Sequence, residues 1–133
     1  MVELLVIEDN VGDTVLIRKV VAECQIPIRL RIACDGEQAL QMLADPQYYK
    51  PDLIILDLNV PKVSSTAFLQ RYTPKEVPVV IFSSSQNDAE IRHSMELGAR
   101  EFVQKPIDLQ AFTQAVHGII DRWTAEGCTA GLR

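Results

Sequence analysis

Residues 53–57 have the sequence LIILD, four consecutive apolar residues that end at the carboxylate of Asp57. A strand with one face in water alternates apolar and polar residues, whereas this run has no polar residue before Asp57. The pattern predicts a central strand of a parallel sheet that is covered on both faces. Asp57 is then expected at the carboxyl end of that strand.

Outward from this strand, apolar runs of strand length alternate with amphipathic stretches of helical length. Besides 53–56, strands are expected at residues 2–7, 28–32, 77–82 and 101–104. Helical periodicity of apolar residues covers Leu16 to Cys24, Ala39 to Leu43, about 64–72, Ile91 to Gly98, and Leu109 to Trp123. Five such repeats of strand and helix are typical of an α/β fold with a parallel sheet.

Three local features refine this prediction. Residues 28–32 alternate aliphatic side chains with arginines, which favours an edge strand with one wet face. Asp88 and Asp108 are expected to cap the fourth and fifth helices. Gly98 is expected where the fourth helix ends.

The composition indicates one domain that works away from nucleic acids and membranes. A chain of 133 residues, 47% of them hydrophobic, can bury one core but has no room for a second domain of typical size. The 13 basic against 18 acidic residues give a net charge of −5, which disfavours binding to DNA or RNA phosphates. No run has the length of a membrane span, so a cytoplasmic location is expected. Cys24, Cys34 and Cys128 form no paired motif and are expected to be reduced thiols.

The chemically distinctive polar residues all lie at the carboxyl ends of expected strands. They are Glu8, Asp9, Asp57, Ser83 and Lys105. In an open parallel sheet, ligands bind in the crevice outside these strand ends, so the five side chains are expected to share one site. Three neighbouring carboxylates repel one another unless a cation lies among them, which favours a hard divalent ion such as Mg²⁺. An ammonium group and a hydroxyl suit the oxygens of a phosphoryl group, and a carboxylate can be the nucleophile that forms an acyl phosphate.

Four motifs follow one another along the chain, separated by strand and helix segments. They are VIEDN at 6–10, LIILDLNVP at 53–61, VVIFSSS at 79–85 and EFVQKPID at 101–108. Together they closely resemble the receiver domains of bacterial two-component response regulators, from about residue 3 to residue 123. The resemblance implies a flavodoxin-like (βα)5 fold, which is a doubly wound parallel sheet with the strand order 2-1-3-4-5. The receiver domain would then occupy residues 1–124, and residues 125–133 would form a short tail.

Matched by position, the resemblance implies a phosphoacceptor and a metal site. Asp57 would be the phosphoacceptor. Glu8 and Asp9 would hold Mg²⁺ together with Asp57, and Asn59 would offer its backbone carbonyl to the metal. The phosphoryl donor would be a sensor histidine kinase. The receiver itself would catalyse at most its own phosphorylation and dephosphorylation.

Other matched positions would bind the phosphoryl group and transmit its presence. Ser83, with Ser84 beside it, takes the position of the switch hydroxyl, and Lys105 takes that of the phosphate-binding lysine. Phe102 falls where receivers usually keep a rotameric aromatic residue. A last helix that ends at Trp123 and the absence of an output domain are similar to small regulators that partner phytochrome-type kinases. Output is then expected through protein contacts that change on phosphorylation.

Two stretches leave alternatives open. Ser64 and Ser65 stand where receivers usually have Asp-Gly or a similar pair, which puts the backbone geometry next to Asp57 in doubt. The apolar stripe from Leu109 to Trp123 is first of all a core face. Its minority interpretation is a surface for homodimerisation or kinase docking.

Two other classes of function would use a similar set of residues. A free-standing enzyme with an aspartyl nucleophile, such as a small phosphatase, would also need a carboxylate, a lysine and a hydroxyl. The sequence disfavours it because Asn59, not a second acid, stands two residues after Asp57. A pseudo-receiver that only binds partners would be expected to lack Asp57, Asp9 or Lys105, and the sequence retains all three.

Overall fold

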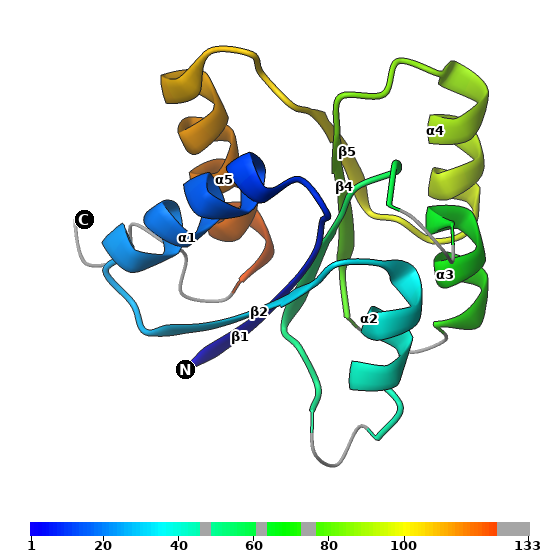
Figure 1. Ribbon diagram of the computed structural model, residues 1–133, viewed down its shortest axis with the longest axis horizontal. Coiled ribbons are helices and arrows are strands. Elements are labelled where there is room, and N and C mark those ends of the chain that lie inside the picture. Colours follow the sequence, from blue (N-terminus) through cyan, green and yellow to red (C-terminus); the bar gives the residue numbers. More distant parts are fainter. Residues whose placement is uncertain (46–48, 61–63, 73–76, 125–133) are drawn as a thin grey trace.

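The computed structural model describes residues 1–45, 49–60, 64–72 and 77–124, which form a parallel sheet with helices on both faces (Figure 1). The strands are β1 (Val2–Ile7), β2 (Ile28–Ala33), β3 (Leu53–Leu56), β4 (Val79–Ser83) and β5 (Glu101–Gln104). The helices are α1 (Val11–Glu23), α2 (Gly36–Met42), α3 (Ser65–Arg71), α4 (Asp88–Glu96) and α5 (Leu109–Trp123). The predicted doubly wound α/β class is confirmed.

The sheet has the strand order β2-β1-β3-β4-β5, and neighbouring strands are parallel. The order implied by the resemblance is therefore confirmed, and β2 is an edge strand as its alternating residues predict. From β1 the chain moves outward to β2 and then returns to the other side of β1 as β3. The direction of winding thus reverses between β1 and β3, which is where sheets of this kind bind ligands.

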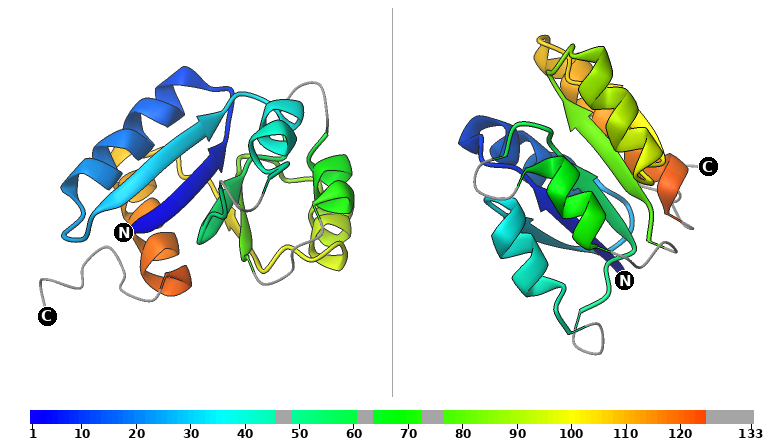
Figure 2. Two further views of the ribbon diagram at one scale, coloured as in Figure 1. Left: turned by 90° about the horizontal axis from the view of Figure 1, so that it is seen from below. Right: turned by 90° about the vertical axis from the view of Figure 1, so that its right-hand side faces the viewer.

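Alternate residues of the inner strands face two separate apolar cores. In β1, Leu5 and Ile7 join the core beneath α2, α3 and α4, whereas Leu4 and Val6 join the core beneath α1 and α5. The two views in Figure 2 show these helix groups on opposite faces of the sheet. All four residues of β3 are buried in the same way, which explains the unbroken apolar run at 53–56. Each such side chain contributes about 1.5–3 kcal/mol through burial.

Short polar side chains cap the helices that begin at the carboxyl edge of the sheet. Asp108 caps α5 as predicted, because its Oδ2 accepts the backbone N–H of Ala111 at 2.9 Å. The predicted cap at Asp88 is wrong by one residue. Asn87 accepts the N–H of Glu90 at 3.0 Å, and Asp88 is the first residue of α4. Asn and Asp are equally good N-caps, so the sequence does not separate these two neighbours.

The ends of β4 and α4 are fixed by the backbone. β4 begins at Val79 rather than at the expected Val77, since Pro78 has no N–H to offer to a ladder. Gly98 follows the end of α4 with a φ of 115°, a conformation that side chains rarely adopt, which confirms its expected place.

One of the three cysteines differs from expectation. Cys24, directly after α1, is disulfide-bonded, so the expectation of a reduced thiol is wrong for this residue. Cys34 is free and exposed, and Cys128 lies outside the described residues. Among the helices of the described residues, none is both long and apolar enough to cross a bilayer.

Candidate functional site

The carboxylates Glu8, Asp9 and Asp57 lie together where β1 and β3 end side by side. Glu8 and Asp9 follow Ile7, and Asp57 follows Leu56, which is the partner of Ile7 in the sheet. The backbone N–H of Asp57 donates to the carbonyl of Ile7 at 3.1 Å and holds the two segments in register. One oxygen of each carboxylate lies within 4.8 Å of the others. Glu8 and Asp57 are buried, and Asp9 is exposed.

The ammonium group of Lys105 lies among these carboxylates. Lys105 follows β5, and its backbone N–H donates to the carbonyl of Ser83 at 3.0 Å, so β4 fixes its place. Its Nζ donates to Glu8, to Asp57 at 3.0 Å and to Asp13 at 2.8 Å. The Lys105 side chain is only 8% exposed, so these ion pairs are largely withdrawn from water.

Asp13 belongs to this cluster although the sequence analysis did not single it out. It lies in the first turn of α1, and its backbone N–H donates to the capping side chain of Asn10 at 3.0 Å. An acidic residue in a first turn is ordinarily explained by the helix dipole, so its type carried no signal of a site. The available signal was position, because the start of α1 returns over the strand end that carries Asp9.

Burial and neighbouring charges shift the central groups in different directions. Burial, followed by hydrogen bonding with Asp57, raises the pKa of Glu8 from 4.5 to about 7. Burial also acts to raise the pKa of Asp57, but hydrogen bonding with Glu8 and the charge of Lys105 outweigh it and lower that pKa below its usual value. For Lys105, burial acts to lower the pKa, but hydrogen bonds to Asp13 and Glu8 raise it well above the usual range. Asp57 is therefore held as a carboxylate, the nucleophilic form.

The donor set of Glu8, Asp9 and Asp57 fits a hard divalent cation, which prefers carboxylate oxygens. Backbone groups orient two of these carboxylates. The N–H of Asn10 donates to Glu8 Oε2 at 3.2 Å, and the N–H of Asn59 donates to Asp57 Oδ1 at 3.2 Å. A cation would also offset the buried negative charge that raises the pKa of Glu8. The metal contact expected of the Asn59 carbonyl stays a prediction.

The residues expected to sense a phosphoryl group occupy three environments. Ser83 is fully buried, and a hydrogen bond with Asp57 is among the causes that lower the pKa of that carboxyl. Ser84 is exposed just beyond the end of β4. Phe102 on β5 is partly buried and packs against the core beneath α2, α3 and α4.

Ser64 and Ser65 replace the usual pair without leaving a gap in the hydrogen bonding. Ser64 caps α3, because its Oγ accepts the N–H of Ala67 at 3.1 Å. Ser65 is buried, and its hydroxyl donates to the backbone carbonyl of Asp57. The two serines thus begin α3 and support the segment that carries Asp57.

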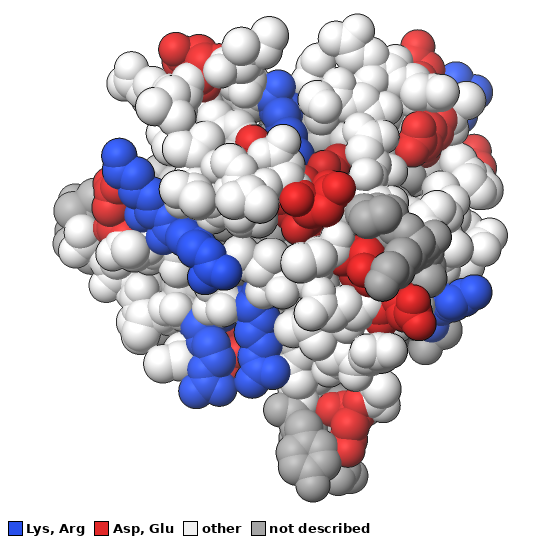
Figure 3. All heavy atoms as spheres, viewed as in Figure 1, with Lys and Arg blue, Asp and Glu red and all other residues white. Residues whose placement is uncertain are grey.

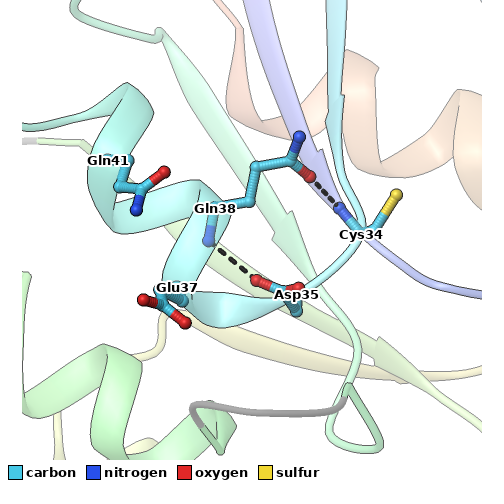
Figure 4. Close-up of a pocket in the computed structure, with 5 residues that line it drawn as sticks. All are labelled: Cys34, Asp35, Glu37, Gln38 and Gln41. Carbon is cyan, nitrogen blue, oxygen red and sulfur yellow. Dashed lines mark hydrogen bonds between the residues drawn. The ribbon is translucent and has the colours of Figure 1, made fainter.

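Charge and shape around the site are unevenly distributed. Acidic side chains gather near the middle of the face in Figure 3, where β1 leads into α1, while basic side chains lie to one side over α1 and β2. A separate pocket of about 400 Å³ lies between the end of β2 and α2 (Figure 4). Its lining includes Cys34, and the backbone N–H of Cys34 donates to Gln38 Oε1 at 2.6 Å. Asp35 lines the same pocket and accepts the N–H of Gln38 at 2.7 Å.

Known proteins are similar to this chain in fold and sequence over nearly its whole length. Response regulator Rcp1 of Synechocystis is 31% identical over 128 residues, which cover 90% of this chain and 87% of Rcp1. The Mn²⁺-bound form of Rcp1 has a TM-score of 0.86 at 29% identity and covers 94% of this chain and 96% of that one. The phosphorylated cyanobacterial phytochrome response regulator RcpA has a TM-score of 0.86 at 32% identity, over 94% and 95% of the two chains.

A match of a different kind is a protein-glutamate methylesterase/protein-glutamine glutaminase of Myxococcus xanthus. It is 38% identical over 77 residues, which cover 56% of this chain but only 21% of the enzyme.

The family model described as the response regulator receiver domain matches residues 4–117. That range contains all five strands except the start of β1, together with every carboxylate of the cluster and Lys105. The chain therefore belongs to the response regulator receiver domain family.

Proposed function

We propose that this protein accepts one phosphoryl group on Asp57 from a sensor histidine kinase, with Mg²⁺ bound beside it. The observation that carries the proposal is the buried carboxylate of Asp57, which lies beside the acidic pair Glu8 and Asp9 and accepts a hydrogen bond from the ammonium of Lys105. Receiver domains interact with histidine kinases, so the donor is a phosphohistidine of such a kinase.

The transfer exchanges one P–N bond for one P–O bond. A carboxylate oxygen of Asp57 attacks phosphorus, and the imidazole nitrogen of the kinase leaves with the electron pair of the broken bond. Asp57 needs no base, because its lowered pKa keeps it deprotonated. Lys105 donates hydrogen bonds to the phosphoryl oxygens, where negative charge is concentrated.

Glu8, Asp9 and Asp57 would hold the Mg²⁺, with the backbone carbonyl of Asn59 as a further ligand. When bound, the ion offsets the charge of the phosphoryl oxygens and lets an anion approach a group of carboxylates. Mg²⁺ is the proposed ion because it pairs carboxylate ligands with phosphate oxygens. The Rcp1 structure in its Mn²⁺-bound form supports a divalent cation in a related protein.

The phosphoryl group is proposed to be sensed by Ser83, with Ser84 as a neighbouring contact and Phe102 as the aromatic that follows. The buried Ser83 is among the groups that lower the pKa of Asp57, so its hydroxyl has a short way to move toward new phosphate oxygens. Phe102 is only partly buried, so a change of its rotamer would alter the surface at β5. Phosphorylation would then bias an existing equilibrium and change the surface of α4, β5 and α5.

The proposed kinase is of the phytochrome type, and the proposed location is the cytoplasm. RcpA is a phytochrome response regulator, and its similarity to this chain extends over almost the whole of both. Homodimerisation through α5 is the proposed second contact. The net charge of −5 supports partners other than nucleic acids.

We also infer that the protein turns over no external substrate. The methylesterase relative shares only 21% of its own length with this chain, which gives no support for esterase activity here. The receiver domain is proposed to span residues 1–124, and the proposed tail, 125–133, lies outside the described residues.

Labelling with acetyl phosphate in the presence of Mg²⁺ tests the proposal. Intact mass should rise by one phosphoryl group, and peptide mapping should locate that group on Asp57. Asp57→Asn should take up no label, whereas Asp88→Asn, at an exposed acid in the first turn of α4, should be labelled like the wild type. A label elsewhere would contradict the assignment, and continuous turnover of a phosphoester would favour an aspartyl enzyme.

Light scattering of the same protein with and without beryllofluoride tests the proposed dimer. A protein that is monomeric in both conditions would reject it.

A further inference from the structure

The phosphoryl transfer described above makes no use of the ion pair between Lys105 and Asp13. Its N–O distance of 2.8 Å is shorter than the 3.0 Å between Lys105 and Asp57. The Asp13 side chain is 23% exposed, so solvent screens this pair less than a surface ion pair. The contact ties the first turn of α1 to the residue that follows β5.

Lys105 has no N–H left for a phosphoryl oxygen in this arrangement. An ammonium group has three N–H donors, and each one is directed at a different carboxylate, those of Glu8, Asp13 and Asp57. A phosphoryl group that enters the site must therefore replace one of these acceptors. The carboxylates that still accept from Lys105 then determine the position of its ammonium group.

Two of the three acceptors belong to the candidate metal site. Glu8 and Asp57 are in the cluster that fits a divalent cation, whereas Asp13 is not. A cation there competes for the oxygens that Lys105 uses and repels the ammonium charge. Of the three bonds of Lys105, the one to Asp13 is thus the one that metal binding leaves intact.

We infer that Asp13 is a positioning residue, which retains the Lys105 ammonium at the site when a divalent cation takes over Glu8 and Asp57. The N–H groups released from those carboxylates then face the phosphoryl group. The inference rests on the proposed function and explains how Lys105 serves it. The helix suits this task, because the side chain of Asn10 holds the Asp13 backbone and Ile17 anchors α1 in the core. A carboxylate on a packed helix can hold a flexible lysine in one place.

The variant Asp13→Asn tests the inference, because the amide keeps the size of the side chain and removes its charge. With acetyl phosphate and Mg²⁺, Asp57 should be phosphorylated on the order of tenfold more slowly, the effect of losing one charge-assisted hydrogen bond. Asp13→Glu should recover most of the rate. In a Lys105→Ala background, Asp13→Asn should have no further effect, since a residue that acts through Lys105 cannot act without it.

A second measurement needs no phosphodonor. The ¹⁵N signal of the Lys105 ammonium should stay sharp in the wild type after Mg²⁺ is added, and in Asp13→Asn it should broaden only in the presence of Mg²⁺. The matched control is Glu37→Gln, which removes an acidic charge from the first turn of α2. Identical labelling rates and identical Lys105 signals in Asp13→Asn and Glu37→Gln would overturn the inference. Absence of label on the wild type would reject the proposed function instead, and the signal with Mg²⁺ alone would still decide the role of Asp13.

Discussion

At the scale of the residue, the site gathers more negative charge than its one lysine can balance. Three carboxylates, Glu8, Asp13 and Asp57, pair with the ammonium of Lys105, and the carboxylate of Asp9 lies close to those of Glu8 and Asp57. Two neighbouring buried acids respond in opposite ways, since the pKa of Glu8 is raised and that of Asp57 is lowered. Of these two acids, Glu8 is therefore the one that binds a proton more readily, while Asp57 keeps the negative charge that a nucleophile needs. Environment, not residue type, divides the roles of these two acids.

The raised pKa of Glu8 predicts how the stability of the metal-free protein changes with pH. The folded state binds the Glu8 proton more tightly than the unfolded state, where the pKa is near 4.5. The stability that this group contributes is therefore complete below pH 4.5, falls as the pH rises toward about 7, and is lost above that. Glu8→Gln should not show this loss. Between acid and alkaline pH, its free energy of unfolding should therefore rise by about 1–3 kcal/mol relative to that of the wild type.

Urea unfolding in EDTA at about pH 5 and about pH 8 measures this difference. Glu37→Gln is the control, because it removes an exposed glutamate and should keep the pH dependence of the wild type. Parallel curves for Glu8→Gln and the wild type would show that Glu8 titrates alike in the folded and unfolded states. Added Mg²⁺ should also remove the loss of wild-type stability between these two pH values, since a carboxylate that binds a metal ion gives up its proton.

At the scale of the element, the end of α5 is tied to the start of β5. The indole N–H of Trp123 donates to Glu101 at 2.7 Å, and Arg122 donates to the same carboxylate at 3.0 Å. Trp123 also packs, partly buried, against the core beneath α1 and α5. These contacts give the last residue of the apolar stripe a structural role, whatever surface the rest of the helix offers.

Trp123→Ala should therefore lower the free energy of unfolding by about 2–3 kcal/mol, because it removes a large, partly buried ring. Trp123→Phe should lose about 1–2 kcal/mol, since it keeps most of the packing and loses the hydrogen bond to a charged acceptor. Leu109→Ala, at the exposed start of the same helix, should change stability by less than about 0.5 kcal/mol. Thermal and urea unfolding measure all three. A wild-type stability of Trp123→Ala would mean that the ring is not part of the fold and would favour an association role.

At the scale of the whole molecule, the sequence predicts the layers of the fold and only part of the site. The unbroken apolar run at 53–56 identifies a strand covered on both faces, because burial on two sides leaves no place for a polar residue. Periodicity does not contain the order of the strands, and the resemblance to receivers supplied it. Strand-end residues such as Glu8 and Asp57 were predictable because the ends of parallel strands share an edge. The contacts of Asp13 and Ser65 were not predictable, since they depend on how α1 and α3 are rotated against that edge.

The same arrangement would couple the proposed metal to the stability of the entire chain. Glu8 and Asp9 follow β1 and Asp57 follows β3, so the three proposed ligands come together only in the folded state. A ligand that binds only the folded state stabilises it, by about 2.7 kcal/mol when its concentration is a hundred times its Kd. Millimolar Mg²⁺ should therefore raise the melting temperature of the wild type by several degrees.

Asp9→Asn should be at least as stable as the wild type without metal and less stable than the wild type with Mg²⁺. Without metal, removing one of several neighbouring carboxylates relieves repulsion, and Asp9 is exposed, so the variant should melt at or slightly above the wild-type temperature. With Mg²⁺, the loss of one charged ligand weakens binding, so the wild type should melt at the higher temperature. NaCl at matched ionic strength separates this effect from general screening, which would stabilise both proteins alike. An equal shift of wild type and variant by Mg²⁺ would remove Asp9 from the metal site, whereas no shift in either would remove the site itself.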